Sequence, residues 1–399
     1  MKILHVSSAR LFGGGERHLV DLARGLAERG HDVYAALVPG SPLDAEMSSI
    51  TPRGVVELPL RNALDLRSAL RLARFVRERE VEIVHAHVAR DYPLAAIAAR
   101  RSPLARLVVT RHVMFPLSRA HRLALANVSR VVAVSEAVAR SLRARGIFPA
   151  HKIRVVPNAV DVRRFQDARQ RFELERRDRD SPGGRQTGFA AESTLRVGIV
   201  GELSEVKGQD VFIRAATLVS ERFAGTVEFV IVGGEASPAG ERRAALEKLV
   251  AQLGLNGRVT FTGHCEDVAG VLSSLDVFVS ASRSESFGIA LVEAMASGLA
   301  VVATATDGAR EIIEDGLTGS LVPVADPNSL AQLGDMNPSE AVVVGDTPYD
   351  AEAAGKAGLS TVSAGATLTP RASSFTALTY ASSSSPRLNC SAPSGCRTA

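Results

Sequence analysis

The chain has 399 residues, of which 46% are hydrophobic and 5% aromatic, with three cysteines and no tryptophan. This length exceeds one ordinary domain and predicts two or three, each with a sizeable core. So few cysteines exclude a disulfide-stapled scaffold and fit a cytoplasmic location. Met1–Ser8 lacks the pattern of a signal peptide, and no run of the sequence reaches transmembrane length.

The net charge of +4 conceals an uneven distribution. Residues 1–165 hold 27 Lys and Arg against 14 Asp and Glu, a balance of +13, whereas residues 196–333 hold 10 against 18, a balance of −8. A basic front half predicts an anionic partner. Base-stacking aromatic residues are sparse there, so no nucleic acid is predicted. Peripheral contact with an anionic membrane, at the inner face of the cell membrane, and a plain solvated surface both stay open.

Residues 1–165 alternate short apolar runs, typical of strands, with amphipathic runs, typical of helices. Glu16–Arg29 predicts a helix that stops at Gly30, and Asp65–Glu80 predicts an arginine-rich helix. The predicted strands are Ile3–Ser8, Val33–Val38, Ile83–His87, Leu107–Thr110, Val131–Val134 and Ile153–Val156. Because these strands are continuously apolar, they predict a parallel sheet covered on both faces.

Residues 166–195 are polar and lack an apolar period, which predicts a flexible linker or insertion. The α/β pattern then resumes over residues 196–333. Its predicted strands are Leu195–Val200, Val227–Val232, Val259–Thr262, Val277–Ser280 and Ala300–Ala303. The expected fold class is therefore α/β, with two Rossmann-like, doubly wound parallel-sheet domains facing a cleft. Ligands of such sheets bind at the carboxyl ends of the strands.

The sequence changes character after residue 333. Residues 334–364 are predicted to form a short α/β fragment, in which a strand at Ala341–Val344 precedes an acidic loop with Asp346 and Asp350. Residues 365–399 are rich in Ser, Thr, Ala and Pro without periodicity, and they predict a disordered tail.

The segment Ser284–Met295 is the most informative part of the chain. It holds Glu285 and Glu293, eight positions apart, and follows an apolar strand. Gly288 and Ile289 are predicted to open a helix, whose unpaired N–H groups attract phosphate. An anion site with carboxylates beside it suits a ligand that carries both a diphosphate and hydroxyl groups. A nucleotide sugar is such a ligand.

Other candidates lie where strands end. Gly13–Gly15 separate the first strand from the first helix, and they predict either a phosphate-binding loop or a tight turn. Lys207, seven residues after a strand, is a candidate to neutralise a diphosphate, with an exposed surface lysine as the alternative. Gly233–Gly234 and Gly263 end two more strands, where they would admit a nucleotide base or form ordinary turns.

Histidines follow two strands of the first half. His85 and His87 would face the same way on a strand. Since neither a Cys nor a clear carboxylate completes a metal site, we predict no metal and interpret His85 as structural. His112 comes directly after a strand end, and we expect it to bind sugar hydroxyls.

On these residues, positions 1–333 resemble the family 4 glycosyltransferases, retaining enzymes of the two-domain GT-B fold. The most specific element is Glu285 to Glu293 in its Ser-Glu-Ser-Phe-Gly setting. The supporting elements are Gly13–Glu16, Val84–His87, Thr110–His112, Val155–Asp161, Lys207–Gly208 and Asp315–Gly319.

The resemblance implies a hexosyltransferase that moves a sugar from a nucleotide-sugar donor to a glycan or lipid-linked acceptor, as in lipopolysaccharide or exopolysaccharide synthesis. It implies no cofactor and no metal. Glu293 would bind the ribose, Glu285 the donor sugar, and His112 the transferred sugar, while Lys207 would stabilise the leaving diphosphate. The donor site would also be lined by Gly13, Gly14, Gly15, Gly201, Gly263, Phe287, Gly288 and Ile289.

Two features depart from the family pattern. Glu202 stands where members usually carry Arg, and two like charges ~4 Å apart repel by about 4 kcal/mol at an effective dielectric of about 20. Three alternatives follow: Glu202 turns away, it pairs with Lys207, or donor binding is weak. The second departure follows residue 333, where further helices are expected and Gly345–Asp350 instead resembles the magnesium loop of haloacid-dehalogenase-like hydrolases. The predicted alternatives are a non-catalytic nucleotide-sugar-binding module and, third, a magnesium-dependent phosphohydrolase.

Overall fold

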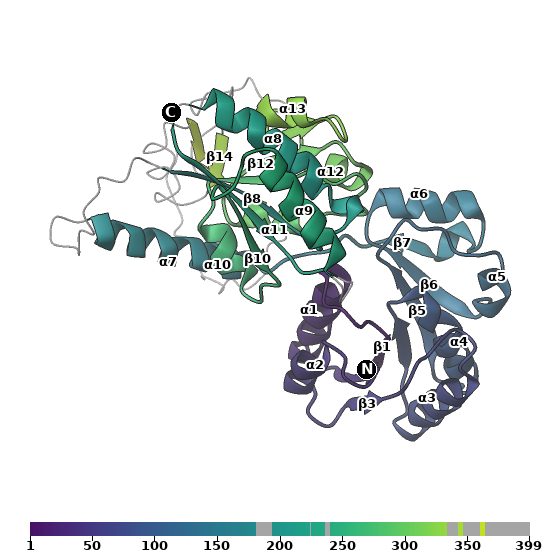
Figure 1. Ribbon diagram of the computed structural model, residues 1–399. Coiled ribbons are helices and arrows are strands. Elements are labelled where there is room, and N and C mark those ends of the chain that lie inside the picture. The colour runs from purple at the N-terminus through teal and green to yellow at the C-terminus, as the bar shows by residue number, and fades with distance from the viewer. Residues whose placement is uncertain (181–193, 224, 236–239, 333–341, 346–359, 364–399) are drawn as a thin grey trace, which may run out of the picture.

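The computed structural model describes residues 1–180, 194–223, 225–235, 240–332, 342–345 and 360–363. It consists of two α/β domains, each built on one parallel sheet with helices around it (Figure 1). The predicted fold class is confirmed. Apolar strands buried on both faces, such as β9 (Val227–Val232), account for the parallel arrangement.

The N-terminal domain has a seven-stranded sheet in the order β3-β2-β1-β4-β5-β6-β7. Its strands are β1 Lys2–Ser7, β2 Asp32–Leu37, β3 Val55–Glu57, β4 Ile83–Ala86, β5 Arg106–Arg111, β6 Val128–Ala133 and β7 Ile153–Val155. Its helices are α1 Gly14–Glu28, α2 Asp44–Ile50, α3 Leu66–Glu78, α4 Tyr92–Arg100, α5 His121–Ala124 and α6 Glu136–Arg145. Strand order reverses between β1 and β4, and ligands of doubly wound sheets bind at this switch point.

Alternate residues of the central strands enter separate layers. Leu4 and Val6 of β1 belong to the apolar cluster that also contains Leu72 of α3 and Leu94 of α4. Ala35 and Leu37 of β2 pack with Leu19 and Val20 of α1 on the opposite face. His5, between Leu4 and Val6, therefore points toward the α1 face, as period-two alternation requires.

The C-terminal domain has a six-stranded sheet in the order β10-β9-β8-β11-β12-β13. Its strands are β8 Leu195–Val200, β9, β10 Val259–Gly263, β11 Val277–Ser280, β12 Ala300–Thr304 and β13 Ser320–Val322. Its helices are α8 Gln209–Arg222, α9 Glu241–Gln252, α10 Val268–Ser273, α11 Ile289–Ala296, α12 Asp307–Ile312 and α13 Pro327–Ala331, with a short 3-10 turn at Glu205–Lys207.

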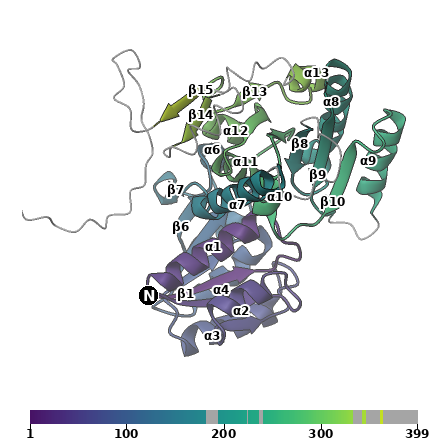
Figure 2. The same ribbon diagram turned by 90° about the vertical axis from the view of Figure 1, so that its left-hand side faces the viewer.

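A long helix begins between the two sheets and replaces much of the predicted linker. This helix, α7, spans Val162–Asp180 and lies against α10 (Figure 2). Phe165 and Ala168 are buried in the apolar cluster of the C-terminal domain, and Arg169 donates to the carbonyl oxygens of Ser273 and Leu275 at 2.8 and 3.0 Å. The prediction of a flexible linker is therefore wrong for residues 166–180, which continue a helix that is held to the C-terminal domain by burial of Phe165 and Ala168 and by the hydrogen bonds of Arg169.

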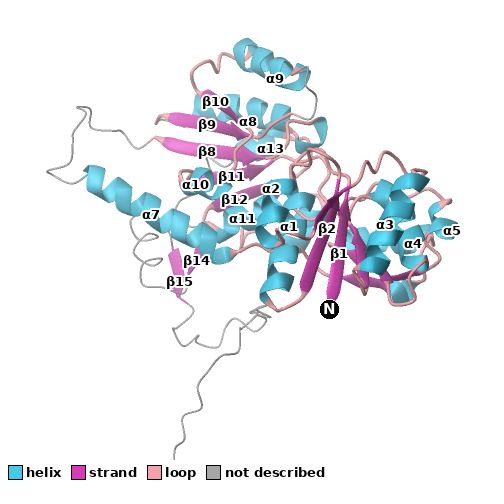
Figure 3. Ribbon diagram, turned by 90° about the horizontal axis from the view of Figure 1, so that it is seen from below, coloured by secondary structure: helices cyan, strands magenta, loops and turns pink. Residues whose placement is uncertain are grey.

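Two short strands lie apart from both sheets. β14 (Val342–Gly345) pairs in parallel with β15 (Ser360–Ser363), below α7 in Figure 3. The strand predicted at 341–344 is confirmed in this position. Asp346, Asp350 and the tail at 365–399 lie outside the described residues. Among the helices that the structure describes, none combines the length and hydropathy needed to span a bilayer.

Candidate functional site

The first turns of α1 and α11 meet across the domain boundary. A Cβ built on Gly14, the first residue of α1, would lie 3.1 Å from Cδ1 of Ile289, the first residue of α11. Gly288, which precedes α11, has a φ of 106°, a left-handed conformation that favours glycine. The unpaired N–H groups and positive dipole ends of two helices are thus concentrated in one place, which favours an anion.

The glycine loop before α1 is held by Glu16. The backbone N–H of Gly13 donates to Oε2 of Glu16 at 3.1 Å. Burial raises the pKa of the Glu16 carboxyl, and the nearby charge of Glu202 adds to the rise. Glu202 therefore approaches the start of α1 from the other domain.

Lys207 and Glu285 form an ion pair with 2.6 Å between Nζ and Oε2. Ser282 donates to the same oxygen at 3.3 Å. A Cβ on Gly201 would lie 3.3 Å from Cδ of Lys207, so the lysine stem runs over that glycine. The structure thus brings the two predicted residues together. Of the alternatives left open for Glu202, the pairing with Lys207 is not the one that the structure shows, because Glu285 holds the lysine and Glu202 is exposed.

Glu293 lies on α11 beside basic residues that the sequence pattern did not reveal. Burial raises the pKa of its carboxyl to about 7, while Arg17 of α1 and Arg164 of α7 oppose the rise. The carboxyl group therefore lies within electrostatic reach of Arg17 on α1 and Arg164 on α7. Neither arginine belongs to a recognisable motif, and they reach the site only through the packing of three helices.

Phe287 is only 8% exposed and packs into the apolar cluster of the N-terminal domain, with Ile289 against that cluster. Its ring anchors the acidic loop to the other domain, while the predicted contact of Phe287 with the donor stays a prediction. Gly308, which the sequence pattern did not single out, supports the same loop. Its N–H donates to the carbonyl of Glu285 at 3.0 Å, and a Cβ there would lie 2.7 Å from the carbonyl oxygen of Phe287.

Three glycines lie side by side along the carboxyl edge of the second sheet. Gly233 donates its N–H to the carbonyl of Gly263 at 2.9 Å, and a Cβ on Gly233 would collide with the carbonyl oxygen of Gly201 at 1.9 Å. This edge is the predicted place for the nucleotide, and β-carbon-free backbone lets a flat base approach closely.

Five of the nine histidines gather under the glycine loop. Ring centroids of His18 and His112 lie 5.2 Å apart, and those of His87 and His112 lie 5.7 Å apart. A Cβ on Gly15 would lie 3.5 Å from Cγ of His112, so the glycine loop rests on this ring. The contact of His112 with the transferred sugar, which the resemblance implies, stays a prediction.

Three of these histidines, His5, His85 and His87, have nitrogen atoms within 4.8 Å of one another, a spacing that could hold a metal ion. Several of the nitrogens already have partners, however. His85 Nε2 lies 2.7 Å from Oγ1 of Thr110, and His5 Nδ1 lies 3.0 Å from Nε2 of His87. No carboxylate or thiolate of the described residues joins the group.

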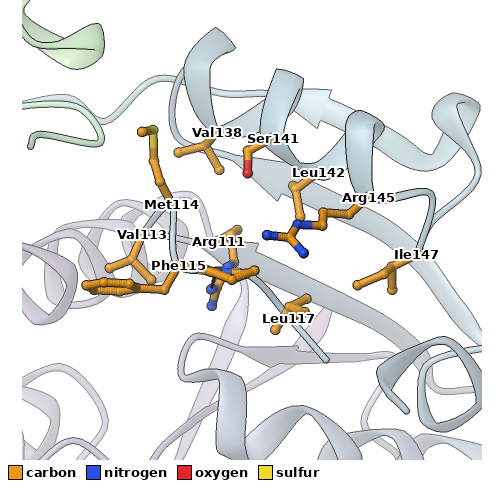
Figure 4. A pocket seen from close by; sticks show the side chains of 11 residues that line it. Arg111, Val113, Met114, Phe115, Leu117, Val138, Ser141, Leu142, Arg145 and Ile147 are labelled. Atoms are coloured by element: carbon orange, nitrogen blue, oxygen red, sulfur yellow. Dashed lines mark hydrogen bonds between the residues drawn. The ribbon is translucent and has the colours of Figure 1, made fainter. Parts of the chain in front are cut away.

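A small cavity lies beyond His112, between the loop that follows β5 and helix α6. Figure 4 shows Arg111 and Arg145 among apolar side chains that include Met114 and Leu142. Its volume of about 10 Å³ holds no more than one water. It is not itself a sugar site in this conformation.

Comparison with known proteins matches each domain to a glycosyltransferase family. The model described as Glycosyltransferase Family 4 matches residues 12–164, and the model described as Glycosyl transferases group 1 matches residues 194–333. The chain therefore carries one glycosyltransferase domain of each of these two descriptions. Each of these two domains therefore contributes its own set of residues to the domain boundary.

The relatives of these two domains include enzymes of inositol glycosylation. A GDP-mannose-dependent alpha-(1-6)-phosphatidylinositol monomannoside mannosyltransferase of Mycolicibacterium smegmatis is 29% identical over 83% of this chain and 88% of its own. A D-inositol 3-phosphate glycosyltransferase of Corynebacterium jeikeium is 34% identical over 45% of this chain. The match spans 42% of that protein's length.

The fold also matches solved structures. HepE of Anabaena in complex with UDP and glucose aligns with a TM-score of 0.70, at 22% identity, over 84% of this chain and 89% of that one. A glycosyltransferase of Rickettsia africae aligns with the same TM-score at 23% identity, over 84% of this chain and 87% of that one. At this identity the likeness concerns the GT-B arrangement of the two domains.

Proposed function

We propose that this chain transfers a hexose-like sugar from a nucleotide-sugar donor to a glycan or lipid-linked acceptor, with retention of configuration. The observation that carries the proposal is the meeting of α1 and α11 at Gly14 and Ile289, with the Lys207–Glu285 pair beside it. This arrangement offers positive character to a diphosphate and carboxylates to hydroxyl groups within one region.

The proposed chemistry is electrostatic. The bond between the anomeric carbon and the diphosphate breaks, and Lys207 with the N–H groups at Gly14 and Gly288 stabilises the charge that develops on the leaving group. The acceptor hydroxyl attacks from the leaving-group face, and its proton passes to the departing diphosphate oxygen. No side chain is assigned as a covalent nucleophile, and neither a metal nor a cofactor takes part.

The roles of the two acids follow from their surroundings. Glu285 forms an ion pair with Lys207, and its carboxylate oxygens can accept hydrogen bonds from sugar hydroxyls. Glu293 is largely buried and near Arg17, so it suits the ribose hydroxyls of a nucleoside enclosed between the domains. A glutamine in place of either glutamate would offer the hydroxyl groups a neutral amide oxygen, which accepts weaker hydrogen bonds than a carboxylate.

A lipid-linked acceptor is favoured by the relatives, one of which is named for a phosphatidylinositol monomannoside substrate and another as a phosphatidyl-myo-inositol mannosyltransferase. It also fits the surface of α3 and of the turn before it, where Leu64, Leu66 and Leu70 are 90, 56 and 45% exposed next to exposed arginines. We propose that this surface touches an anionic membrane, which would bring the site to its acceptor at the inner face of the cell membrane.

The experiment is a two-stage assay on the purified chain. A thermal-shift screen of nucleotide sugars selects the donor, because a ligand that binds only the folded state raises its stability. Transfer is then measured for the wild type, Glu293→Ala and Lys207→Ala. We expect both variants to lose at least about tenfold in transfer, the loss of one charge-assisted hydrogen bond.

Equal activity in all three proteins would refute the assignment. Donor binding without transfer to any acceptor of a broad panel would instead favour the non-catalytic nucleotide-sugar-binding module.

A further inference from the structure

The histidines under the glycine loop form a connected row that reaches from the core of the first sheet to His112. His5 Nδ1 lies 3.0 Å from His87 Nε2, and His87 Nδ1 lies 3.4 Å from His112 Nε2. His5 is fully buried at 0% exposure on β1, and His87 follows β4, the neighbouring strand. The row therefore starts inside the domain and ends at the proposed sugar site.

The two ends of the row lack partners among the described residues. Nε2 of His5 and Nδ1 of His112 are both shielded from solvent and make no hydrogen bond there. Inside the row, by contrast, every ring nitrogen faces a nitrogen of the next ring. Consecutive hydrogen bonds between rings produce this pattern, in which the inner nitrogens have partners and one nitrogen at each end has none.

All three rings are neutral at physiological pH. Burial lowers the pKa of His5 to about 4 and that of His112 to about 3, and it lowers the pKa of His87 well below its usual range. A neutral imidazole carries one N–H donor and one acceptor nitrogen. Because each link joins Nδ1 of one ring to Nε2 of the next, a hydrogen bond at both links requires the same tautomer on all three rings.

We propose that His5 and His87 are positioning residues that fix the tautomer of His112, so that its Nδ1–H is presented as a hydrogen-bond donor to the substrate. His5 then donates from Nδ1 to His87, and His87 donates from Nδ1 to His112. One part of this proposal rests on the proposed function: the acceptor of the hydrogen bond from His112, which is an oxygen of the transferred sugar.

The direction of the chain follows from where an unpaired N–H is tolerated. With Nδ1–H on every ring, the open atom of His5 is a lone pair and the open N–H belongs to His112. With Nε2–H on every ring, an N–H would be left without an acceptor at the fully buried end. Buried N–H groups without partners are rare in proteins, and both end atoms are shielded here. The two ends differ because His5 is 0% exposed, whereas the His112 ring is partly exposed beside the domain boundary, where a ligand can supply an acceptor to its N–H.

Imidazole nitrogen NMR on histidine-labelled protein tests the hydrogen-bonded row of rings without any substrate. The nitrogen shifts distinguish Nδ1–H, Nε2–H and protonated rings, and single-histidine variants assign the signals. We expect Nδ1–H on His5, His87 and His112 at neutral pH. A protonated ring, mixed tautomers along the row, or Nε2–H at His112 would overturn the proposal.

Variants separate positioning from packing. His87→Phe keeps a ring but removes both links, so we expect His112 to change to a tautomer mixture and transfer to fall by about tenfold in kcat, the loss of one hydrogen bond. His5→Asn can still donate near the position of Nδ1 and should retain the wild-type shift of His112, whereas His5→Phe should not. His85→Phe, next to His87 but bonded to Thr110, is the matched control and should leave the tautomer of His112 unchanged.

A zinc titration addresses the competing use of the same rings. If the three rings are linked by hydrogen bonds as proposed, Zn²⁺ at micromolar concentration should leave the nitrogen signals unchanged. Stoichiometric Zn²⁺ binding that removes the ring N–H signals of His5 and His87 would overturn the proposal in favour of a metal site. Since these readouts need no donor or acceptor, a failure here is distinguishable from a failure of the proposed transfer reaction.

Discussion

Single residues at the domain boundary are held in states that favour binding over stability. Glu293 keeps a carboxyl group largely buried, and burial raises its pKa to about 7 despite Arg17 and Arg164. Lys207 and Glu285 form an ion pair at 2.6 Å, and in the proposed function a diphosphate and a sugar would compete for the two partners. Perturbed groups of this kind are typical of functional sites.

Glu293→Gln should therefore stabilise the protein and weaken the binding of the donor. The folded pKa lies above the ordinary value of 4.5, so the contribution of Glu293 to stability is fully present below that value and is lost as the pH rises through about 7. At about pH 8 the variant should gain up to about 3 kcal/mol in free energy of unfolding, measured by urea titration. Donor affinity, by calorimetry, should fall by about tenfold.

The matched control is Asp21→Asn, since burial also raises the pKa of Asp21 and it lies near Glu293. That variant should alter the pH profile of stability but bind the donor as the wild type does. A Glu293→Gln protein that is less stable than the wild type at about pH 8 would contradict this account.

Glu285→Gln should affect recognition of the sugar but not recognition of the nucleoside diphosphate. Removing the carboxylate frees Lys207 for phosphate, so the affinity for the nucleoside diphosphate alone should be unchanged or higher. Transfer from the whole nucleotide sugar should fall by about tenfold or more, because a charge-assisted contact to the sugar is lost. Calorimetry and initial rates measure the two effects, and a parallel fall in both would argue against separate roles.

Among the elements, α6 is capped from the other domain. Oε2 and Oε1 of Glu311 on α12 accept the N–H groups of Glu136 and Ala137 at 2.8 and 2.6 Å. Ser135 caps the same helix from its own domain, accepting from the N–H of Val138 at 3.1 Å. A carboxylate at a helix N-terminus is stabilised by the dipole, so this contact holds the two domains together.

Glu311→Ala should loosen domain closure, whereas Ser135→Ala should mainly weaken the N-terminal domain. We expect the first to increase the radius of gyration in small-angle scattering and to lower donor affinity a few-fold. The second should cost about 1 kcal/mol of stability, a typical cap. Identical scattering curves for the wild type and Glu311→Ala would show that this contact does not control closure.

The elements also show what the sequence could and could not reveal. Long apolar strands such as β9 and the helix start at Gly288 carry their own patterns and were predicted from the sequence. The edge strands β3 and β13, of three residues each, are too short for a pattern, and α7 buries only a narrow face. Glu285 and Glu293 belong to one local motif and Lys207 to a strand–helix junction. Arg17 and Arg164, by contrast, come near Glu293 only through the packing of α1, α7 and α11.

At the scale of the whole molecule, charge is divided between the domains, with +13 over residues 1–165 and −8 over residues 196–333. The basic domain exposes leucines and arginines together on α3, and the acidic domain carries the proposed donor site. This division fits a protein that rests one domain on an anionic surface while the other holds its nucleotide sugar.

Co-sedimentation with vesicles tests the membrane surface. Binding should rise with anionic lipid and fall with salt, because exposed charges are screened. Leu66→Ser combined with Arg71→Gln should reduce binding several-fold, while Leu174→Ser, which alters a leucine 53% exposed on α7, should not. Binding that is indifferent to lipid charge and salt would contradict the proposal.

Hydrogen exchange with and without the donor tests the central claim most directly. A nucleotide sugar seated between the domains should slow exchange at two separate places, the start of α1 at 13–18 and the segment 285–293, since both offer N–H groups to it. Lys207→Ala should weaken both effects together. Protection confined to one domain, or none at saturating donor, would contradict a site shared by the two.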